Sequence, residues 1–314
     1  MISVVLFIFG LCVGSFLNVV ALRYDGEHFV FDPKIIGSPR TKPGESGSDR
    51  SRCPHCGKVL HWYELVPIVS FVVQEGKCRG CKAKIGWHYP AVELVTGLIF
   101  VAVPWRLVPG PWSLIPCASS LIHVPCPMSL VPGLWFLALL WILAFLFLLL
   151  ISYIDILLGI IPDELEIMLG ISALGIVALE SIGNWKLGIG NSFLGPYASV
   201  FGFQQNLWTS HLIGAVAAFA FFELLVLITR GRGMGMGDVK LALPLGFLFG
   251  WPDIIVAVMA AFILGAIAGG SGILLGKKTM RATLPFGPFL AAGAAFIFFF
   301  GLPVAQWYFG LMGA

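Results

Sequence analysis

Apolar residues run along this chain in long stretches that are separated by polar segments. Eight stretches approach the roughly 20 residues that a helix needs to cross a bilayer. They cover residues 2–22, 91–108, 132–153, 161–182, 211–229, 239–251, 253–275 and 285–304. The sixth is short and contains Pro244, so it is the weakest candidate for a span. The pattern predicts an all-α polytopic membrane protein with about eight transmembrane helices.

Composition agrees with this pattern. Hydrophobic residues make up 58% of the chain, charged residues only 11%, and the mean hydropathy is +0.94. Soluble domains carry about 25% charged residues, so the composition excludes a water-soluble fold. The net charge of +3 is small and gives no reason to expect a nucleic-acid partner. The composition therefore implies a protein that lies in a lipid bilayer.

The basic residues predict an orientation. Under the eight-span arrangement, 17 of the 19 Lys and Arg residues fall on one side, in segments 23–90, 230–240 and 276–284. Only Arg106 and Lys186 fall on the other side. Because cytoplasmic loops carry the excess of Lys and Arg, these three segments are expected in the cytoplasm.

Three parts of the chain follow from this arrangement. No basic residue precedes the first apolar stretch, which is the reverse of a cleavable signal peptide, so 1–22 is predicted to be an anchor with its amino terminus outside. Residues 23–90 form a cytoplasmic domain, and 91–314 form a multi-helix membrane domain.

Three segments between the predicted elements are distinctive in composition. The cytoplasmic domain begins with a Gly-, Ser- and Pro-rich stretch, 37–50, that is typical of a flexible linker. Two predicted outside loops, 107–131 and 183–210, are unusually long and contain no recognisable chemical motif.

Two CxxC motifs follow the linker, Cys53-Pro-His-Cys56 and Cys78-Arg-Gly-Cys81. Each motif turns two thiolates toward one point, and two such knuckles complete a closed tetrahedral site of the kind that holds structural Zn²⁺. A metal would stabilise a domain too small for a core of its own. Two disulfides or a redox pair are the alternatives; a cytoplasmic location argues against disulfides, and a redox motif leaves the second pair unused.

The residues around these cysteines carry smaller expectations. Gly57 and Gly80 are expected where the knuckle turns need a permissive backbone, and His55 and His88 are expected not to be ligands. Of the other cysteines, Cys12 is expected to be an apolar helix residue. Whether Cys117 and Cys126 form a disulfide in the first outside loop stays open.

Acidic residues near membrane helices are rare and usually functional. Asp155, Asp163, Glu164 and Glu166 follow the third stretch, and Asp238 begins the sixth in Gly235-Met-Gly-Asp238. The predicted topology places both groups at the cytoplasmic edge. An aspartyl peptidase needs two carboxylates that share one proton across a water molecule, and Asp155 and Asp238 are the candidate pair.

Other interpretations of these acids stay open. They could be interfacial acids neutralised by basic residues of the same edge, namely Arg230, Arg232 or Lys240. They could form the proton or cation relay of a transporter, and the chain could also be a non-catalytic assembly factor. The glycines of 231–237 do not form a phosphate loop, because no strand precedes them and no Gly-Lys-Ser/Thr follows.

Taken together, the motifs resemble those of the type IV prepilin peptidases, bifunctional leader peptidases and N-methyltransferases of type IV pilus and type II secretion systems. The resemblance covers most of the chain and rests on motifs in a fixed order. They are Gly14-Ser-Phe-Leu-Asn-Val-Val20 with Arg23, the paired CxxC motifs, His61-Trp-Tyr-Glu-Leu-Val-Pro67, Tyr89-Pro-Ala-Val-Glu-Leu-Val-Thr96, Ile154-Asp155 with Ile161-Pro-Asp163, Gly235-Met-Gly-Asp-Val-Lys240 and Pro285-Phe-Gly-Pro288.

The resemblance implies roles for these residues. The family pattern maps the first catalytic carboxylate to Asp155 rather than Asp163, and the second to Asp238. It implies cleavage of the basic leader of type IV prepilins or pseudopilins after a glycine, at the cytoplasmic face of the bacterial inner membrane. It also implies methylation of the new terminal amine, usually on Phe, with S-adenosylmethionine.

The methyltransferase half is implied by the resemblance alone. No Gly-x-Gly-x-x-Gly motif follows a strand, so a chain with peptidase activity only is an alternative. Residues that contact S-adenosylmethionine are unknown; Glu64 and Glu93 are the candidates, each with a structural role as the alternative. The chain departs from the family where Arg23 is followed by Tyr24-Asp25 instead of x-Pro, and in the lengths of loops 107–131 and 183–210.

Overall fold

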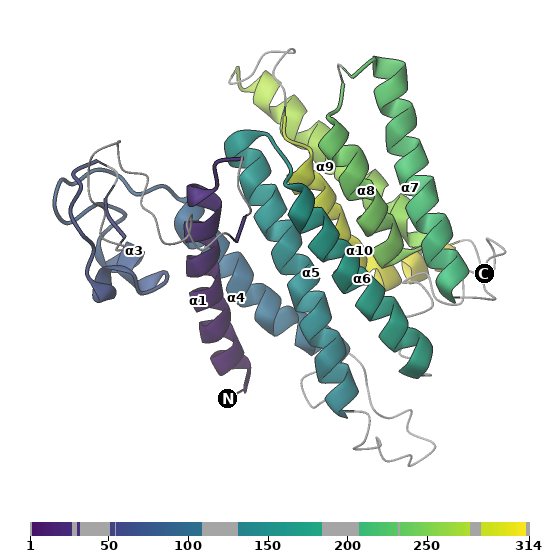
Figure 1. Cartoon of the computed structure of the whole chain (residues 1–314), viewed down its shortest axis with the longest axis horizontal. Coiled ribbons are helices and arrows are strands. Elements are labelled where there is room, and N and C mark those ends of the chain that lie inside the picture. The colour runs from purple at the N-terminus through teal and green to yellow at the C-terminus, as the bar shows by residue number, and fades with distance from the viewer. Residues whose placement is uncertain are drawn as a thin grey trace. The chain divides into compact units, whose positions relative to one another are not determined.

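The protein is described here from a computed structural model. It describes residues 2–26, 30–31, 51–53, 55–108, 131–183, 207–231, 233–276 and 284–311. Within these residues the chain is almost entirely helical, and it divides into two compact units, Met1–Ala138 and Leu139–Ala314 (Figure 1).

In the first unit, helix α1 (Ile2–Arg23) packs along helix α4 (His88–Leu107). Glycines set the closeness of this contact. A Cβ atom at Gly10 would lie 2.8 Å from the Gly97 Cα, and one at Gly14 would lie 2.7 Å from the Glu93 Cα. Small residues allow this approach between apolar helices, and Gly14 therefore aligns the residues that follow it with the start of α4.

In its described residues, the segment between these helices contains only short elements. They are the 3₁₀ turn η1 (Trp62–Glu64) and helix α3 (Val69–Val73). Two isolated β-bridges, Arg52 with Val59 and Lys77 with Lys84, flank the two CxxC motifs. Many of its large apolar side chains are exposed, and helix α3 has no buried residue. Local hydrogen bonds and the cysteines are therefore expected to stabilise this segment.

The second unit is a helical bundle. Its helices are α5 (Val131–Leu158, from Leu139 onward), α6 (Asp163–Gly183), α7 (Leu207–Thr229), α8 (Met236–Phe249), α9 (Asp253–Leu274) and α10 (Gly287–Leu311). Helix α8 packs against α6 and α7, and α9 packs against α10. In the core of the bundle, the ring of Phe298 contacts the rings of Trp141 and Phe145, with centroid distances of 4.5 and 5.0 Å.

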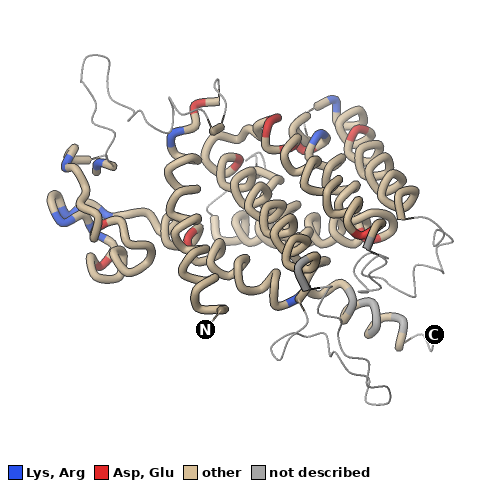
Figure 2. The backbone as a smooth tube through the Cα atoms, turned by 60° about the horizontal axis from the view of Figure 1, so that its bottom comes forward, with Lys and Arg blue, Asp and Glu red and all other residues tan. Residues whose placement is uncertain are grey.

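The prediction of an all-helical membrane protein is confirmed. Each of the eight predicted stretches contains a helix. Among the residues that the structure describes, six helices are long and apolar enough to cross a membrane: α1, α4, α5, α6, α7 and α9. Helix α8, with 14 residues, and the apolar part of α10, Gly287–Gly301, are shorter than that. Charged residues lie mostly near helix ends and over the cysteine segment (Figure 2).

Two boundaries differ from the sequence prediction. Helix α5 continues past residue 153 to Leu158, so Asp155 lies in its last turn instead of following it. Pro244 does not interrupt α8, which runs from Met236 through it to Phe249. A proline removes one backbone donor, and the packing against α6 and α7 outweighs this loss.

Several sequence expectations lie outside the described residues. These are the linker 37–50, most of the long loops 107–131 and 183–210, most of segment 276–284, and the residues Cys117, Cys126, Lys186 and Arg232.

Candidate active site and cysteine cluster

Asp155 lies buried in the last turn of α5. Its Oδ2 atom accepts a hydrogen bond from the backbone N–H of Gly287, at 3.0 Å. Gly287 is the first residue of α10, so this N–H is one of the helix-terminal donors that have no partner within the helix. The bond fixes the orientation of the carboxyl and leaves Oδ1 for other partners.

Asp238 lies buried in the first turn of α8. A helix amino terminus favours a negative charge, because unpaired N–H groups point toward it. Glycines surround the residue: Gly235 precedes the helix, and a Cβ at Gly237 would lie 3.2 Å from the Ile161 side chain. The glycine thus lets the start of α8 lie against the segment that joins α5 and α6.

The structure brings these two carboxyl groups together. The end of α5 and the starts of α6, α8 and α10 lie at the same end of the second unit (Figure 1). Asp155 and Asp238 are close enough to interact electrostatically. Two like charges at short range cannot easily both be ionised, so the pair is suited to hold one proton between its two members.

The neighbouring acids have other contacts. The Lys240 ammonium donates to both carboxylate oxygens of Asp163, at 2.7 and 2.9 Å, and both side chains are exposed. Lys240 therefore pairs with Asp163 and not with the Asp155–Asp238 pair. Glu166, for which the sequence analysis predicts no separate role, is buried and interacts electrostatically with Asp163, Lys240 and Asp238.

The four cysteines of the CxxC motifs form a second site. The Sγ atoms of Cys53, Cys56, Cys78 and Cys81 all lie within 4.8 Å of one another. The Cys53 and Cys81 sulfurs are 3.9 Å apart, well beyond the roughly 2.05 Å of a disulfide. Four converging thiols are the ligand set of a closed, structural zinc site, and the arrangement fits that metal.

The two knuckles are built alike. Gly57 N–H donates to the Cys53 carbonyl and Lys82 N–H to the Cys78 carbonyl, both at 2.9 Å. Gly57 has a φ of +70°, as its predicted role requires, but in the second knuckle the left-handed residue is Lys82, with a φ of +60°, and not Gly80. The prediction for Gly80 was wrong because the equivalent turn position lies one residue after the second cysteine.

Backbone donors prepare one of these thiols for metal. The Cys81 and Gly80 N–H groups lower the pKa of the Cys78 thiol to about 6. The thiolate is the metal-binding form of cysteine. His88, by contrast, lies against the ring of Tyr89, with ring centroids 4.4 Å apart.

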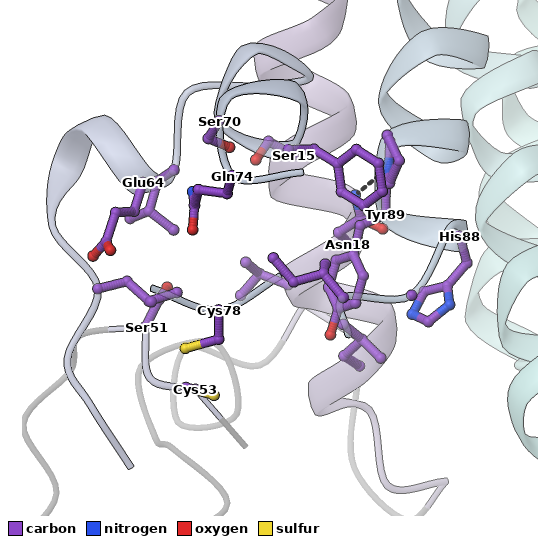
Figure 3. Close-up of a pocket in the computed structure, with 18 of the residues that line it drawn as sticks. Ser15, Asn18, Ser51, Cys53, Glu64, Ser70, Gln74, Cys78, His88 and Tyr89 are labelled. Carbon is purple, nitrogen blue, oxygen red and sulfur yellow. Dashed lines mark hydrogen bonds between the residues drawn. The ribbon is translucent and has the colours of Figure 1, made fainter. Parts of the chain in front are cut away.

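A pocket of about 550 Å³ lies beside the cysteines, within the first unit. Figure 3 shows side chains of α1 and α4, among them Asn18 and Tyr89, across from Glu64, Ser70 and Gln74 of the intervening segment. Both acidic candidates line it. Glu64 accepts from the His61 N–H at 2.9 Å and from Lys58 at 3.1 Å, which is a structural role that lowers the pKa of its carboxyl.

Comparison with known proteins decides the family. Residues 8–107 match the family described as bacterial peptidase A24 N-terminal domain, and residues 141–270 match the type IV leader peptidase family. A prepilin leader peptidase/N-methyltransferase of Bacillus subtilis is 30% identical over 97% of this chain and 96% of its own length. The chain belongs to the type IV leader peptidase family.

Other members of the type IV leader peptidase family give the same result. Proteins named prepilin leader peptidase/N-methyltransferase from Aeromonas hydrophila and Burkholderia pseudomallei are 29% and 31% identical over 96% and 94% of this chain, and over 92% and 84% of their own lengths. No solved structure matches the chain. Asp155 and Asp238 lie within the part that matches the leader peptidase family, and the cysteines within the A24 N-terminal part.

Gly287 is a site residue of this leader peptidase family member that the sequence did not reveal. It lies in Pro285-Phe-Gly287-Pro288, a motif for which the sequence predicts no role beyond the family resemblance. A Cβ at this position would lie 2.8 Å from Asp155 Oδ2, so only glycine lets the α10 amino terminus reach the carboxyl. A glycine between two prolines at the start of an apolar run was the available signal.

We expect Gly287→Ala to lower peptide cleavage by about 10- to 100-fold, because the added methyl group displaces the Asp155 carboxyl by a fraction of an ångström to an ångström. Gly270→Ala is the matched control, since a Cβ there meets nothing within 4 Å. Initial cleavage rates and the thermal unfolding midpoints of both variants check this. Equal rates for the two variants would show that the Gly287 contact does not position Asp155.

Proposed function

We propose that this protein is a membrane aspartyl endopeptidase that removes the basic leader of type IV prepilins or pseudopilins by cleavage after a glycine. The juxtaposition of Asp155 and Asp238 carries this proposal. It is supported by the family to which the chain belongs and by relatives named prepilin leader peptidase/N-methyltransferase.

The chemistry follows from one shared proton. The ionised carboxyl of the pair accepts a proton from a water molecule, whose oxygen attacks the carbonyl carbon of the scissile bond. The protonated carboxyl donates its hydrogen bond to the carbonyl oxygen as charge develops there. The pair then gives one proton to the leaving amine, so the two carboxyl groups again share a single proton, as before the reaction. The Gly287 N–H holds Asp155 in place during these steps.

The proposed active site faces the cytoplasm of a bacterial inner membrane. The distribution of Lys and Arg supports this orientation, because segments 230–240 and 276–284 carry six of the seven Lys and Arg residues that follow residue 138, and segment 23–90 carries eleven more. In this arrangement 1–22 is an anchor, 23–90 is a cytoplasmic zinc-binding domain associated with methyl transfer, and 91–314 is the peptidase domain.

A second activity belongs to the same proposal: methylation of the new amino terminus, usually on Phe. The names of the relatives support it, and the 550 Å³ pocket beside the cysteines has the size for a nucleoside-containing donor. S-adenosylmethionine supplies the methyl group in such a reaction. The chain's own contribution is to bind and orient the donor and the peptide amine and to exclude water. Zinc at the four cysteines would hold the pocket wall.

Mass spectrometry of a prepilin-like peptide, incubated with the purified protein in detergent and S-adenosylmethionine, tests both activities. We expect a cut after the glycine and a mass increase of one methyl group on the mature fragment. A cut without the methyl group would leave a peptidase only. Intact peptide, together with ion flux in proteoliposomes, would favour an ion relay at Asp155 and Asp238 instead.

A further inference from the structure

Two motifs from opposite ends of the first unit's sequence meet at one wall of the pocket. The Gly14–Glu93 contact between α1 and α4 leaves no room for a side chain at residue 14. It places Asn18, one turn further along α1, next to the first turns of α4. Asn18 and Glu93 both line the pocket as a result.

Asn18 offers an acceptor that has no donor in the described part of the chain. Its Nδ2 donates to the Tyr89 carbonyl at 3.1 Å, which fixes the orientation of the amide. Its Oδ1 is buried and accepts no hydrogen bond. An unsatisfied buried acceptor is unfavourable for folding. Because Asn18 lines the pocket, a ligand bound there is the available source of a donor.

Glu93 adds a carboxylate to the same wall. It is buried, and its Oε2 accepts from the Ile68 N–H at 2.8 Å, with a further contribution from the Ser15 side chain. The Glu93 carboxyl group is thus held in position at the pocket, and none of these contacts is with a cation.

Basic side chains also line the pocket. They are Arg23, Arg52 and Lys84, and the charge of Glu64 is balanced by Lys58. The pocket therefore presents basic groups together with an anionic wall. A ligand that carries an ammonium group fits Asn18 and Glu93, and a ligand that also carries a carboxylate has the basic groups as partners.

We infer that Asn18 Oδ1 and the Glu93 carboxylate form a subsite for a primary ammonium group. The inference rests on the proposed methyl-transfer function, in which two molecules bring such a group: the methyl donor through its α-amino group, and the cleaved peptide through its new amino terminus. Their common chemistry is a nitrogen with several N–H donors, which both acceptors can share.

Binding of matched ligands to the full-length protein in detergent tests this subsite. One pair is S-adenosylhomocysteine and the same compound without its α-amino group; the other is the cleaved peptide with a free and with an acetylated amino terminus. Asn18→Leu removes the acceptor at similar size, and Glu93→Gln removes the charge but keeps an acceptor for Ile68. Thr96→Val is the control, because Thr96 lies on the same helix and its hydroxyl bonds to the Val92 carbonyl instead.

We expect Asn18→Leu and Glu93→Gln each to weaken binding of one free-amine ligand by about tenfold or more, as for loss of a charge-assisted hydrogen bond. The matched amine-free ligand should bind wild type and variants equally, and Thr96→Val should change neither. The ligand pair that shows this selective loss identifies the source of the ammonium. Peptide cleavage near the wild-type rate shows that the variants are folded.

The possible failures are distinct. If Asn18→Leu and Glu93→Gln weaken binding of the amine and the amine-free ligand equally, or weaken neither, the ammonium subsite is wrong. The methyl-transfer proposal still stands in that case, provided that the wild-type protein binds a free-amine ligand. A wild-type protein that binds neither free-amine ligand and adds no methyl group overturns both.

Discussion

Asp155→Asn is expected to lower cleavage of a prepilin-like peptide by about 10³-fold or more, and Asp238→Asn is expected to do the same. An amide can neither take the proton from water nor share a proton with the other carboxyl. Each variant therefore lacks one of the two complementary roles, and the remaining acid cannot fill both. Initial rates by mass spectrometry, in detergent at matched protein concentration, measure the effect.

Asp163→Asn is the matched control for this experiment. Asp163 begins α6 and lies near the same helix ends, but its exposed side chain pairs with Lys240. Because exposed ion pairs contribute little to stability, we expect its cleavage rate to stay within about fivefold of the wild type. Thermal unfolding midpoints close to wild type for all three variants would show that the losses are catalytic. Full activity in either Asp155→Asn or Asp238→Asn would contradict the assignment of the pair.

The second large effect is expected at the cysteine cluster. Cys53→Ser and Cys78→Ser each remove one of four ligands and should release the metal, measured as zinc per protein by elemental analysis. Structural zinc contributes on the order of 10 kcal/mol to the folding of small domains. Residues 51–87 have only short elements and two isolated bridges, so we expect this segment to lose its structure and methyl transfer to fall to background.

Cleavage should fall much less in these variants, because Asp155, Asp238 and Gly287 all belong to the second compact unit. Cys12→Ser is the control: Cys12 is exposed on α1 and lies outside the cluster. Equal loss of cleavage and methyl transfer would show that the cysteine segment also presents the prepilin to the peptidase. Unchanged zinc content in both cysteine variants would contradict the four-sulfur site.

Elements with a strong local signal were predictable from the sequence. Long apolar runs gave the helices, because a run of such residues has few alternatives in a membrane protein. The CxxC spacing gave the cysteine cluster, because two close thiols in each motif leave little freedom. Helix boundaries were less predictable. Hydropathy alone places the end of α5 before the first acidic residue, whereas the helix continues to Leu158 and carries Asp155 in its last turn.

Contacts between distant segments were not predictable. Nothing local to Pro285-Phe-Gly287 indicates that its N–H reaches Asp155, and nothing local to Asn18 indicates an unsatisfied acceptor next to Glu93. Each of these two contacts depends on the close approach of two segments that are distant in the sequence. Gly287 and Gly14 allow that approach, but the sequence does not indicate which segment lies against each glycine. The juxtaposition of Asp155 and Asp238 was predicted from the family pattern and from their shared side of the membrane, not from spacing.

The pH dependence of kcat/KM for peptide cleavage tests the central claim most directly. A pair that works with one ionised and one protonated carboxyl predicts a bell-shaped profile, because activity is lost when both groups are protonated and again when both are ionised. The two apparent pKa values of the bell belong to the pair. A rate that rises with pH to a plateau and stays there would show that a single base suffices, and it would contradict an active site built from Asp155 and Asp238.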